Sequence, residues 1–452
     1  MTRMTRMTLK TALLIGLAHG LMACEMPPPE PGLVLPERMS WETDPVIKAV
    51  GLVPDANYTF ILERPSLWGG TATETSTLIY TANDRGEIDT SRQPANGAED
   101  GSVFYPFRAM TYKREPADGL SPGELRIRLS GPDNDLIDEA IILAGADRNE
   151  LVEMDFSADF PGAFILKKKS ASSPQPAIVL LGGSEGGDGA ARMAAPDLAD
   201  AGFTVLGLPY YSPAWGNSEQ QFPGLNRSFA ALPIDYLEDA VRVLRARDDV
   251  RAGHVMLKGV SKGAEYVLLA GALIPDDSPG GGFCAIVADV PTDVVWEGWG
   301  AAPEGHPEGQ SFSSFSYRGE ALDFVPYANI SRGIDRSDPY TLAQSHADGR
   351  KAHPDRVAPA RIPVEQIDEP VLIIGGDKDS VWPSGPMARA IKATRDEAGL
   401  TTTAFIYEEG GHGVGGTPFR RGNTADGEAR AENYPATLRF LLDAAKRKDC
   451  RG

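Results

Sequence analysis

The chain has 452 residues, which is too long for one ordinary hydrophobic core and predicts two domains. A hydrophobic content of 42% with 24% charged residues is typical of a globular protein and excludes an intrinsically disordered one. The 44 Lys and Arg residues against 63 Asp and Glu residues leave a net charge of −19. Such a field repels polyanions and argues against nucleic acid as a partner.

The N-terminus predicts an export signal over residues 1–23. Basic residues there precede an apolar run, residues 12–18, that is too short to span a bilayer. The run is followed by Leu-Met-Ala-Cys, which resembles a bacterial lipobox, so we expect Cys24 to carry the lipid that anchors the protein to a membrane of the bacterial cell envelope. A plain secretory signal with an incidental cysteine is the alternative. The proline-rich residues 24–38 predict an extended tether.

The next segment, residues 39–166, contains short β-like runs separated by turn residues. Residues 58–62 and 124–129 are two such runs, and Gly-Pro-Asp-Asn at residues 131–134 is one of the turns. Short strands at this spacing favour an immunoglobulin-like β-sandwich. Residues 167–176, rich in lysine, serine and proline, predict a linker.

From residue 177 to residue 452 the pattern changes to alternating strands and helices, which is typical of a mostly parallel, doubly wound α/β sheet. Runs such as residues 177–181 and 370–374 are largely apolar, as expected of strands buried on both faces. An irregular stretch, residues 296–363, concentrates aromatic residues. We weigh two roles for it: a cap or acyl pocket over the site, and a loop packed onto its own cluster.

Two cysteines follow Cys24 in the chain. Cys284 lies in an apolar, strand-like run and is expected to be a small core residue, whereas Cys450 lies in a charged tail. The sequence therefore predicts neither a disulfide framework nor a cysteine-based metal site.

The most informative motif is Gly-Val-Ser-Lys-Gly at residues 259–263. It lies between a strand-like run, residues 254–257, and a helix-like run, residues 266–270. A strand, a Gly-x-Ser-x-Gly turn and a helix together describe a nucleophile elbow, in which a strained backbone presents the serine, here Ser261. The ordinary alternative is a glycine-containing turn, so the assignment depends on the partners of Ser261.

A nucleophilic serine needs a base, and the base needs an acid that orients it. His412 lies in a glycine-rich loop directly after the final predicted strand. Asp377 and Asp379 both follow the preceding predicted strand. We assign the acid to Asp379, deeper in its loop, and a turn-stabilising role to Asp377. The chain order Ser261, Asp379, His412 is that of α/β-hydrolases.

Backbone N–H groups are the predicted oxyanion donors. One belongs to Lys262, which follows the nucleophile, and the others belong to Gly183, Ser184 and Glu185 in a glycine-rich loop. A phosphate-binding loop is the alternative for the second group, but the segment lacks Gly-Lys-Ser/Thr and the glycine spacing of dinucleotide-binding loops.

Several of these motifs together resemble a known family, the acyl-CoA thioester hydrolase / bile acid-CoA:amino acid N-acyltransferase family. The segments that carry the resemblance are residues 180–187, 232–237, 259–265 and 379–384. The resemblance covers most of the chain after the tether. It implies an immunoglobulin-like sandwich in front of an α/β-hydrolase domain, with Ser261, Asp379 and His412 as the triad.

Amino-acid-conjugating members of that family use cysteine as the nucleophile, so Ser261 favours hydrolysis of an acyl thioester or ester, with no metal or cofactor. An exported lipoprotein does not meet acyl-CoA in the usual compartments. Coenzyme A is polyanionic, so a protein with a net charge of −19 is expected to bind it only if Lys262 and nearby arginines form a local basic patch. Acyl transfer to an amine, and a non-catalytic envelope binding protein on the same fold, are the alternatives.

Overall fold

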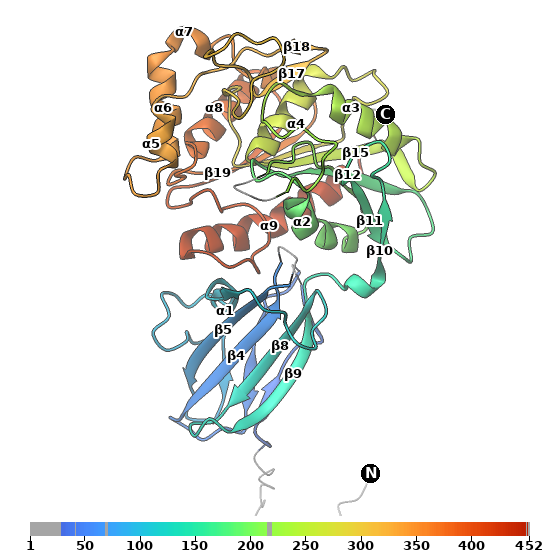
Figure 1. The fold of residues 1–452 in the computed structure, drawn as a ribbon. Coiled ribbons are helices and arrows are strands. Elements are labelled where there is room, and N and C mark those ends of the chain that lie inside the picture. The colour runs from blue at the N-terminus through green and yellow to red at the C-terminus, as the bar shows by residue number, and fades with distance from the viewer. Residues whose placement is uncertain (1–28, 41, 68–70, 215–218, 449, 451–452) are drawn as a thin grey trace, which may run out of the picture.

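A computed structural model of the protein describes residues 29–40, 42–67, 71–214, 219–448 and 450 (Figure 1). The expected signal peptide and Cys24 lie outside the described residues. Within the described ranges, no helix is both long enough and apolar enough to cross a membrane.

The N-terminal part is an all-β domain, as the sequence predicts. It begins inside residues 24–38, which the sequence assigns to an extended tether, because residues 32–34 pair with residues 48–50 and residues 38–39 with residues 143–144. One sheet has three strands in the order β1 (Gly32–Val34), β3 (Lys48–Val50) and β6 (Ile88–Asp89). The other has six, in the order β2 (Arg38–Met39), β9 (Leu136–Ala144), β8 (Glu124–Ser130), β4 (Asn57–Pro65), β5 (Thr73–Thr81) and β7 (Thr111–Lys113). Buried residues alternate with more exposed ones along β4 and β8, because successive side chains of a strand point to opposite faces. The buried set, including Phe60 and Ile127, forms the core of the domain.

The C-terminal part is built on an eight-stranded, mostly parallel sheet. Its order is β10 (Leu151–Asp155), β11 (Phe164–Lys168), β13 (Thr204–Gly207), β12 (Gln175–Leu181), β15 (Val250–Val260), β16 (Ile286–Asp289), β19 (Val371–Gly376) and β20 (Thr402–Tyr407). β10 and β11 pair antiparallel at one edge, and all pairs from β13 to β20 are parallel. This is the expected α/β-hydrolase sheet.

Strands β10 and β11 depart from the expected domain boundary at residue 166. The sequence assigns them to the sandwich and the start of the linker, whereas the structure pairs β11 with β13 of the large sheet. Short runs with one partly exposed face have the same pattern in a sandwich and at the antiparallel edge of an α/β sheet. The pattern therefore identifies these strands but not the sheet that they join.

Helices cover both faces of the large sheet. One face packs against α3 (Asp235–Arg245), α4 (Lys262–Leu273) and α8 (Ser384–Glu397). The other packs against α2 (Gly189–Asp200) and α9 (Thr424–Ala444), and α9 lies between the sheet and the β domain (Figure 1). The smaller elements are α1 (Tyr105–Arg108), η1 (Arg148–Glu150), β14 (Leu232–Pro233), β17 (Phe315–Tyr317), β18 (Glu320–Ala321), α5 (Ile330–Ile334), α6 (Leu342–Ala352), α7 (Pro354–Val357) and η2 (Val364–Gln366).

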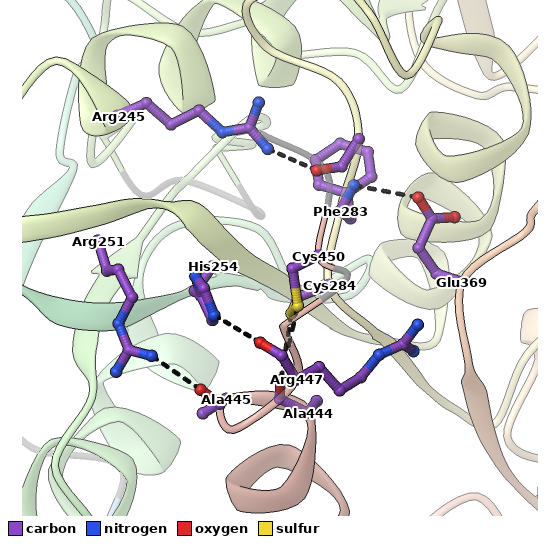
Figure 2. The surroundings of a disulfide bond; sticks show 11 residues. Arg245, Arg251, His254, Phe283, Cys284, Glu369, Ala444, Ala445, Arg447 and Cys450 are labelled. Carbon is purple, nitrogen blue, oxygen red and sulfur yellow. Dashed lines mark hydrogen bonds between the residues drawn. A yellow bond between two sulfur atoms is a disulfide. The ribbon is translucent and has the colours of Figure 1, made fainter.

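A disulfide joins Cys284 to Cys450, which corrects the expectation that the two cysteines are unpaired (Figure 2). The tail that follows α9 runs back along β15, where Arg251 donates to the carbonyl oxygen of Ala445 (2.9 Å) and a ring nitrogen of His254 contacts that of Arg447 (2.9 Å). These contacts bring Cys450 to the strand-like run that contains Cys284. The pairing spans 166 residues and depends on the order of strands in the sheet, so no local pattern indicates it.

We predict that the disulfide stabilises the α/β domain. Replacing Cys450 with Ser should lower the free energy of unfolding by about 2–4 kcal/mol, because the cross-link restricts the unfolded chain. Urea denaturation in non-reducing buffer measures this change. Dithiothreitol should lower the wild-type midpoint to that of Cys450→Ser and leave the variant unchanged. An alkylation assay that finds Cys284 and Cys450 both free in the oxidised protein would contradict the assignment.

Candidate active site

Ser261 lies at the tip of a tight turn between β15 and α4. Its backbone has φ 58° and ψ −120°, a conformation that typically costs ~1–3 kcal/mol for a residue with a side chain. The neighbouring glycines are required by close backbone contacts. A Cβ on Gly259 would lie 2.0 Å from the carbonyl oxygen of Gly263, and one on Gly263 would lie 2.3 Å from that of Gly182. The Ser261 N–H donates to the carbonyl oxygen of Asp289 (2.9 Å), which fixes the turn against β16.

The carboxylate of Asp379 is fully buried and holds His412. Its Oδ2 lies 2.8 Å from Nδ1 of His412 and accepts a hydrogen bond from the hydroxyl of Ser384 (2.6 Å). Its Oδ1 accepts from the N–H groups of Val381 (2.9 Å) and Trp382 (3.3 Å). Four contacts thus fix one carboxylate, which can orient an imidazole that carries its proton on Nδ1.

Asp377 is placed differently. It is exposed and forms a two-pronged ion pair with Arg389 (2.6 and 2.7 Å), whose hydrogen bonds lower the pKa of the Asp377 carboxyl. The structure therefore gives Asp377 a surface partner on α8 and gives Asp379 the histidine. The turn-stabilising role expected for Asp377 is not what its carboxylate does, because both of its oxygens accept from Arg389.

The sheet order explains why residues far apart in sequence meet. Ser261 follows β15, Asp379 follows β19 and His412 follows β20, and these strands run parallel within one half of the sheet. Their carboxyl ends therefore lie at one edge, where α/β sheets bind ligands. Among the hydrogen bonds of the described residues, none joins Ser261 to His412. Such bonds are often long without substrate and tighten when it binds.

Two of the predicted oxyanion donors, the N–H groups of Gly183 and Lys262, differ in whether they already have an acceptor. The N–H of Gly183 donates to the Glu185 carboxylate (2.8 Å), so this donor is engaged within its own loop. Gly183 nevertheless lies against the nucleophile, because a Cβ built on it would come 3.1 Å from Cβ of Ser261. Across the described part of the chain, no acceptor contacts the N–H of Lys262, at the first position of α4. The Lys262 N–H is therefore available to bind an anion.

The side chain of Lys262 does not form a basic patch. It is buried, and its Nζ donates to Glu265 (2.8 Å) and to the hydroxyl of Ser314 (2.9 Å). Burial lowers the pKa of Lys262 and raises that of Glu265. The cation is surrounded by aromatic rings, with the centroid of the Phe229 ring 5.2 Å away. This lysine joins α4 to the irregular stretch and cannot reach a phosphate in solvent.

The aromatic residues of the irregular stretch serve mainly as packing. Trp296 and Phe315 have no exposed surface, and Trp299 stacks on Phe229 with ring centroids 4.4 Å apart. Phe315 and Trp299 pack into the core between the sheet and α3 and α4, so the stretch does not simply fold onto a cluster of its own. Trp296 belongs to a smaller cluster with Trp382, whose ring lies 6.1 Å from that of His412, edge to face.

His346 is a buried residue near the site that the sequence does not single out. It lies on α6, edge to face against the rings of Trp296 (4.5 Å) and Tyr327 (4.9 Å), and its Nδ1 contacts the carbonyl oxygen of Leu342 (2.7 Å). Burial lowers the pKa of His346 to about 3. The surrounding irregular sequence hides this position, although the capping box of Thr341 and Gln344 at the start of α6 is visible in the sequence.

The fold and the arrangement at the strand ends define an α/β-hydrolase domain with a nucleophile elbow. Comparison with known proteins gives a narrower placement. Residues 327–419 match the family described as "BAAT / Acyl-CoA thioester hydrolase C terminal". Over these residues the chain is similar to the acyl-CoA thioester hydrolase / BAAT family, in agreement with the resemblance stated from the motifs.

Individual relatives are distant. Human acyl-coenzyme A thioesterase 1 is 27% identical over 240 residues, which are 53% of this chain and 49% of that protein. Human mitochondrial acyl-coenzyme A thioesterase 2 is 26% identical over 53% of this chain and 42% of its own length. The match thus spans about half the length of each relative. Among solved structures, a truncated carbohydrate esterase from gut microbiota is 16% identical and covers 67% of this chain and 100% of its own, with a TM-score of 0.41.

We predict that His346 makes stability depend on pH. The unfolded chain protonates this imidazole near its ordinary pKa of 6.5, and the folded chain near 3, so between these values the unfolded state binds more protons. Stability is therefore lost as the pH falls, by about 2 kcal/mol between about pH 7.5 and pH 5. Urea denaturation at a series of pH values measures this loss.

His346→Gln is the matched variant for this experiment. Burial raises the pKa of Glu369 to about 7, so that carboxyl contributes with the opposite sign, and stability from it is lost as the pH rises from about 4.5 to 7. Glu369 is unchanged in His346→Gln, so the difference between wild type and variant isolates the histidine. Equal pH dependence in the two proteins would contradict the assignment of a neutral, buried His346.

Proposed function

We propose that the protein is a serine hydrolase that cleaves acyl thioesters or esters through Ser261, His412 and Asp379. The observation that carries the proposal is the contact between Asp379 and His412 (2.8 Å) at the sheet edge where the strained turn presents Ser261. A carboxylate that accepts from Nδ1 leaves Nε2 of the imidazole free to act as a base. Distant relatives named acyl-coenzyme A thioesterases support the reaction class.

The proposed reaction has two steps. In acylation, Nε2 of His412 takes the hydroxyl proton of Ser261, and Oγ attacks the carbonyl carbon of the substrate. The bond to the leaving thiolate or alkoxide breaks, and the imidazolium returns its proton to that group. In deacylation, His412 takes a proton from water, the resulting hydroxide attacks the acyl-enzyme, and the carboxylic acid leaves as Ser261 regains its proton.

The developing oxyanion needs backbone donors. We assign one to the Lys262 N–H and the other to the loop that contains Gly183, Ser184 and Glu185. Because the Glu185 carboxylate accepts from the Gly183 N–H, the substrate oxygen must displace it or use the next N–H groups of the loop. Removal of one such donor typically costs ~2.7–4 kcal/mol of transition-state stabilisation.

The serine nucleophile favours hydrolysis over transfer, because the amino-acid-conjugating members of the family that the chain resembles use cysteine instead. Transfer to an amine would still proceed through the same acyl-enzyme. Product analysis with and without added amino acids separates the two reactions. A non-catalytic binding protein would release neither product.

We also propose that the protein is a lipoprotein of the bacterial cell envelope, anchored through Cys24. The Cys284–Cys450 disulfide supports an exported location, because structural disulfides persist mainly in oxidising compartments. Coenzyme A thioesters are then a less suitable substrate than other acyl esters or thioesters, and the burial of Lys262 removes one cation that could have bound the phosphates.

The first prediction from this proposal concerns the triad. Ser261→Ala should abolish turnover of acyl esters and thioesters of graded chain length, and Asp379→Asn should lower kcat by up to ~10⁴-fold because the imidazole loses its correct tautomer. Steady-state assays measure both effects, and circular dichroism checks that the variants fold. Asp377→Asn is the matched control and should retain activity. Full activity of Ser261→Ala would refute the assignment.

The second prediction concerns the anchor. In a bacterial host, the full chain should partition into the membrane fraction and be released by detergent, because acyl chains bury in the bilayer. Cys24→Ala should appear in the soluble exported fraction with unchanged esterase activity. Membrane association that persists in Cys24→Ala would contradict lipidation at this residue.

A further inference from the structure

The loop that carries His412 is long and connects β20 to α9 (residues 408–423). Its backbone has no regular secondary structure, so contacts with other elements must determine where the imidazole lies. These contacts are with α9 and with the β domain.

Side chains of α9 bind the first half of the loop. Asp426 accepts from the N–H of Gly411 (2.6 Å), and Arg430 donates to the carbonyl oxygen of Gly413 (2.6 Å). These two contacts fix the backbone at the residues immediately before and after His412. Asn433 then donates to the carbonyl oxygen of Val414 (2.8 Å). All three side chains are buried, so their hydrogen bonds are shielded from water.

The second half of the loop enters the β domain. Phe419 is 2% exposed and belongs to the hydrophobic core of that domain, although it is a residue of the α/β part of the chain. Its ring packs edge to face against Phe107 of α1 (5.0 Å) and against Phe104 (5.8 Å). A phenylalanine buried in this way contributes about 1.5–3 kcal/mol relative to an exposed one.

A buried ion pair of the β domain binds the backbone of the loop at Phe419. Arg64 of β4 donates to the carbonyl oxygen of Phe419 (2.6 Å), and Glu74 of β5 holds Arg64 (2.7 Å). The Gly422 N–H donates to the carbonyl oxygen of Arg108 (3.3 Å) farther along the loop. Strands of the N-terminal domain thus fix the backbone of the histidine loop, in addition to the packing of α1 on α9.

We infer that the N-terminal β domain is a positioning element of the active site, acting on His412 through Phe419. The inference rests on the proposed role of His412 as the base. α9 holds the peptide groups around His412, and the β domain holds the far end of the same loop. Loss of the Phe419 contact frees that end, and the imidazole then leaves the position that it needs beside Ser261. Phe419 is a positioning residue and does not touch the substrate.

The test uses the full chain with Phe419→Ala and the milder Phe419→Leu. We expect Phe419→Ala to lower kcat by at least ~10-fold, toward the ~10²-fold that a ~1 Å misplacement costs, with little change in KM. Labelling of Ser261 by a fluorophosphonate probe should slow by a similar factor, because it needs the same base. Phe419→Leu, which keeps most of the buried contact, should restore most of both rates.

Phe60→Ala is the matched control. Phe60 is also a core phenylalanine of the β domain (1% exposed), but its ring packs against Tyr80 and, among the described residues, forms no aromatic ring pair with the histidine loop. It should lower the stability of the β domain as much as Phe419→Ala while kcat and the labelling rate stay at the wild-type level.

Three outcomes would overturn the inference, and they differ. If wild type turns over substrate and labels at Ser261, but folded Phe419→Ala does so at the same rates, the β domain does not position His412 through Phe419. If Phe60→Ala loses activity equally, the loss in Phe419→Ala comes from general destabilisation of the β domain and not from the contact of Phe419 with the histidine loop. If wild type neither turns over substrate nor labels at Ser261, the proposed function fails and this inference fails with it.

Discussion

The backbone at Ser261 is the constraint on which the rest of the site depends. Its positive φ is maintained because Gly259 and Gly263 permit backbone contacts that no side chain would allow, and because its N–H is bound by the strand next in the sheet. The turn is stable only when β15, β16 and the loop after β12 are packed together. The conformation of Ser261, on which its proposed chemistry depends, is thus a property of the assembled sheet.

The same packing explains the contrast between two charged groups near the nucleophile. Asp379 is buried but satisfied by four hydrogen bonds, so it can remain an acceptor for His412. Lys262, directly after Ser261, is buried and paired with Glu265, so its charge serves packing. Its backbone N–H, which no acceptor of the described residues contacts, is the proposed oxyanion donor. The side chain of Lys262 therefore has a structural role, and its backbone N–H has a proposed catalytic role.

The α/β-hydrolase fold and the three proposed triad residues could be predicted from the sequence, because the motifs that identify them are local. Ser261, Asp379 and His412 each follow an apolar strand, and their order identifies the fold. Strand pairing is not a local property. The sequence therefore did not indicate which sheet β10 and β11 join, or that Cys450 forms a disulfide. The burial of His346 and the insertion of Phe419 into the other domain also depend on tertiary packing, which periodicity does not encode.

Trapping the acyl-enzyme tests the central claim most directly. The protein would be mixed with an acyl thioester, quenched with acid during the burst phase and digested for mass spectrometry. If Ser261 is the nucleophile, the acyl mass will be found on the peptide that contains Ser261 and will disappear on further incubation in water as free acid accumulates. Product release with the acyl group on another residue, or an equal adduct in Ser261→Ala, would contradict this role of Ser261.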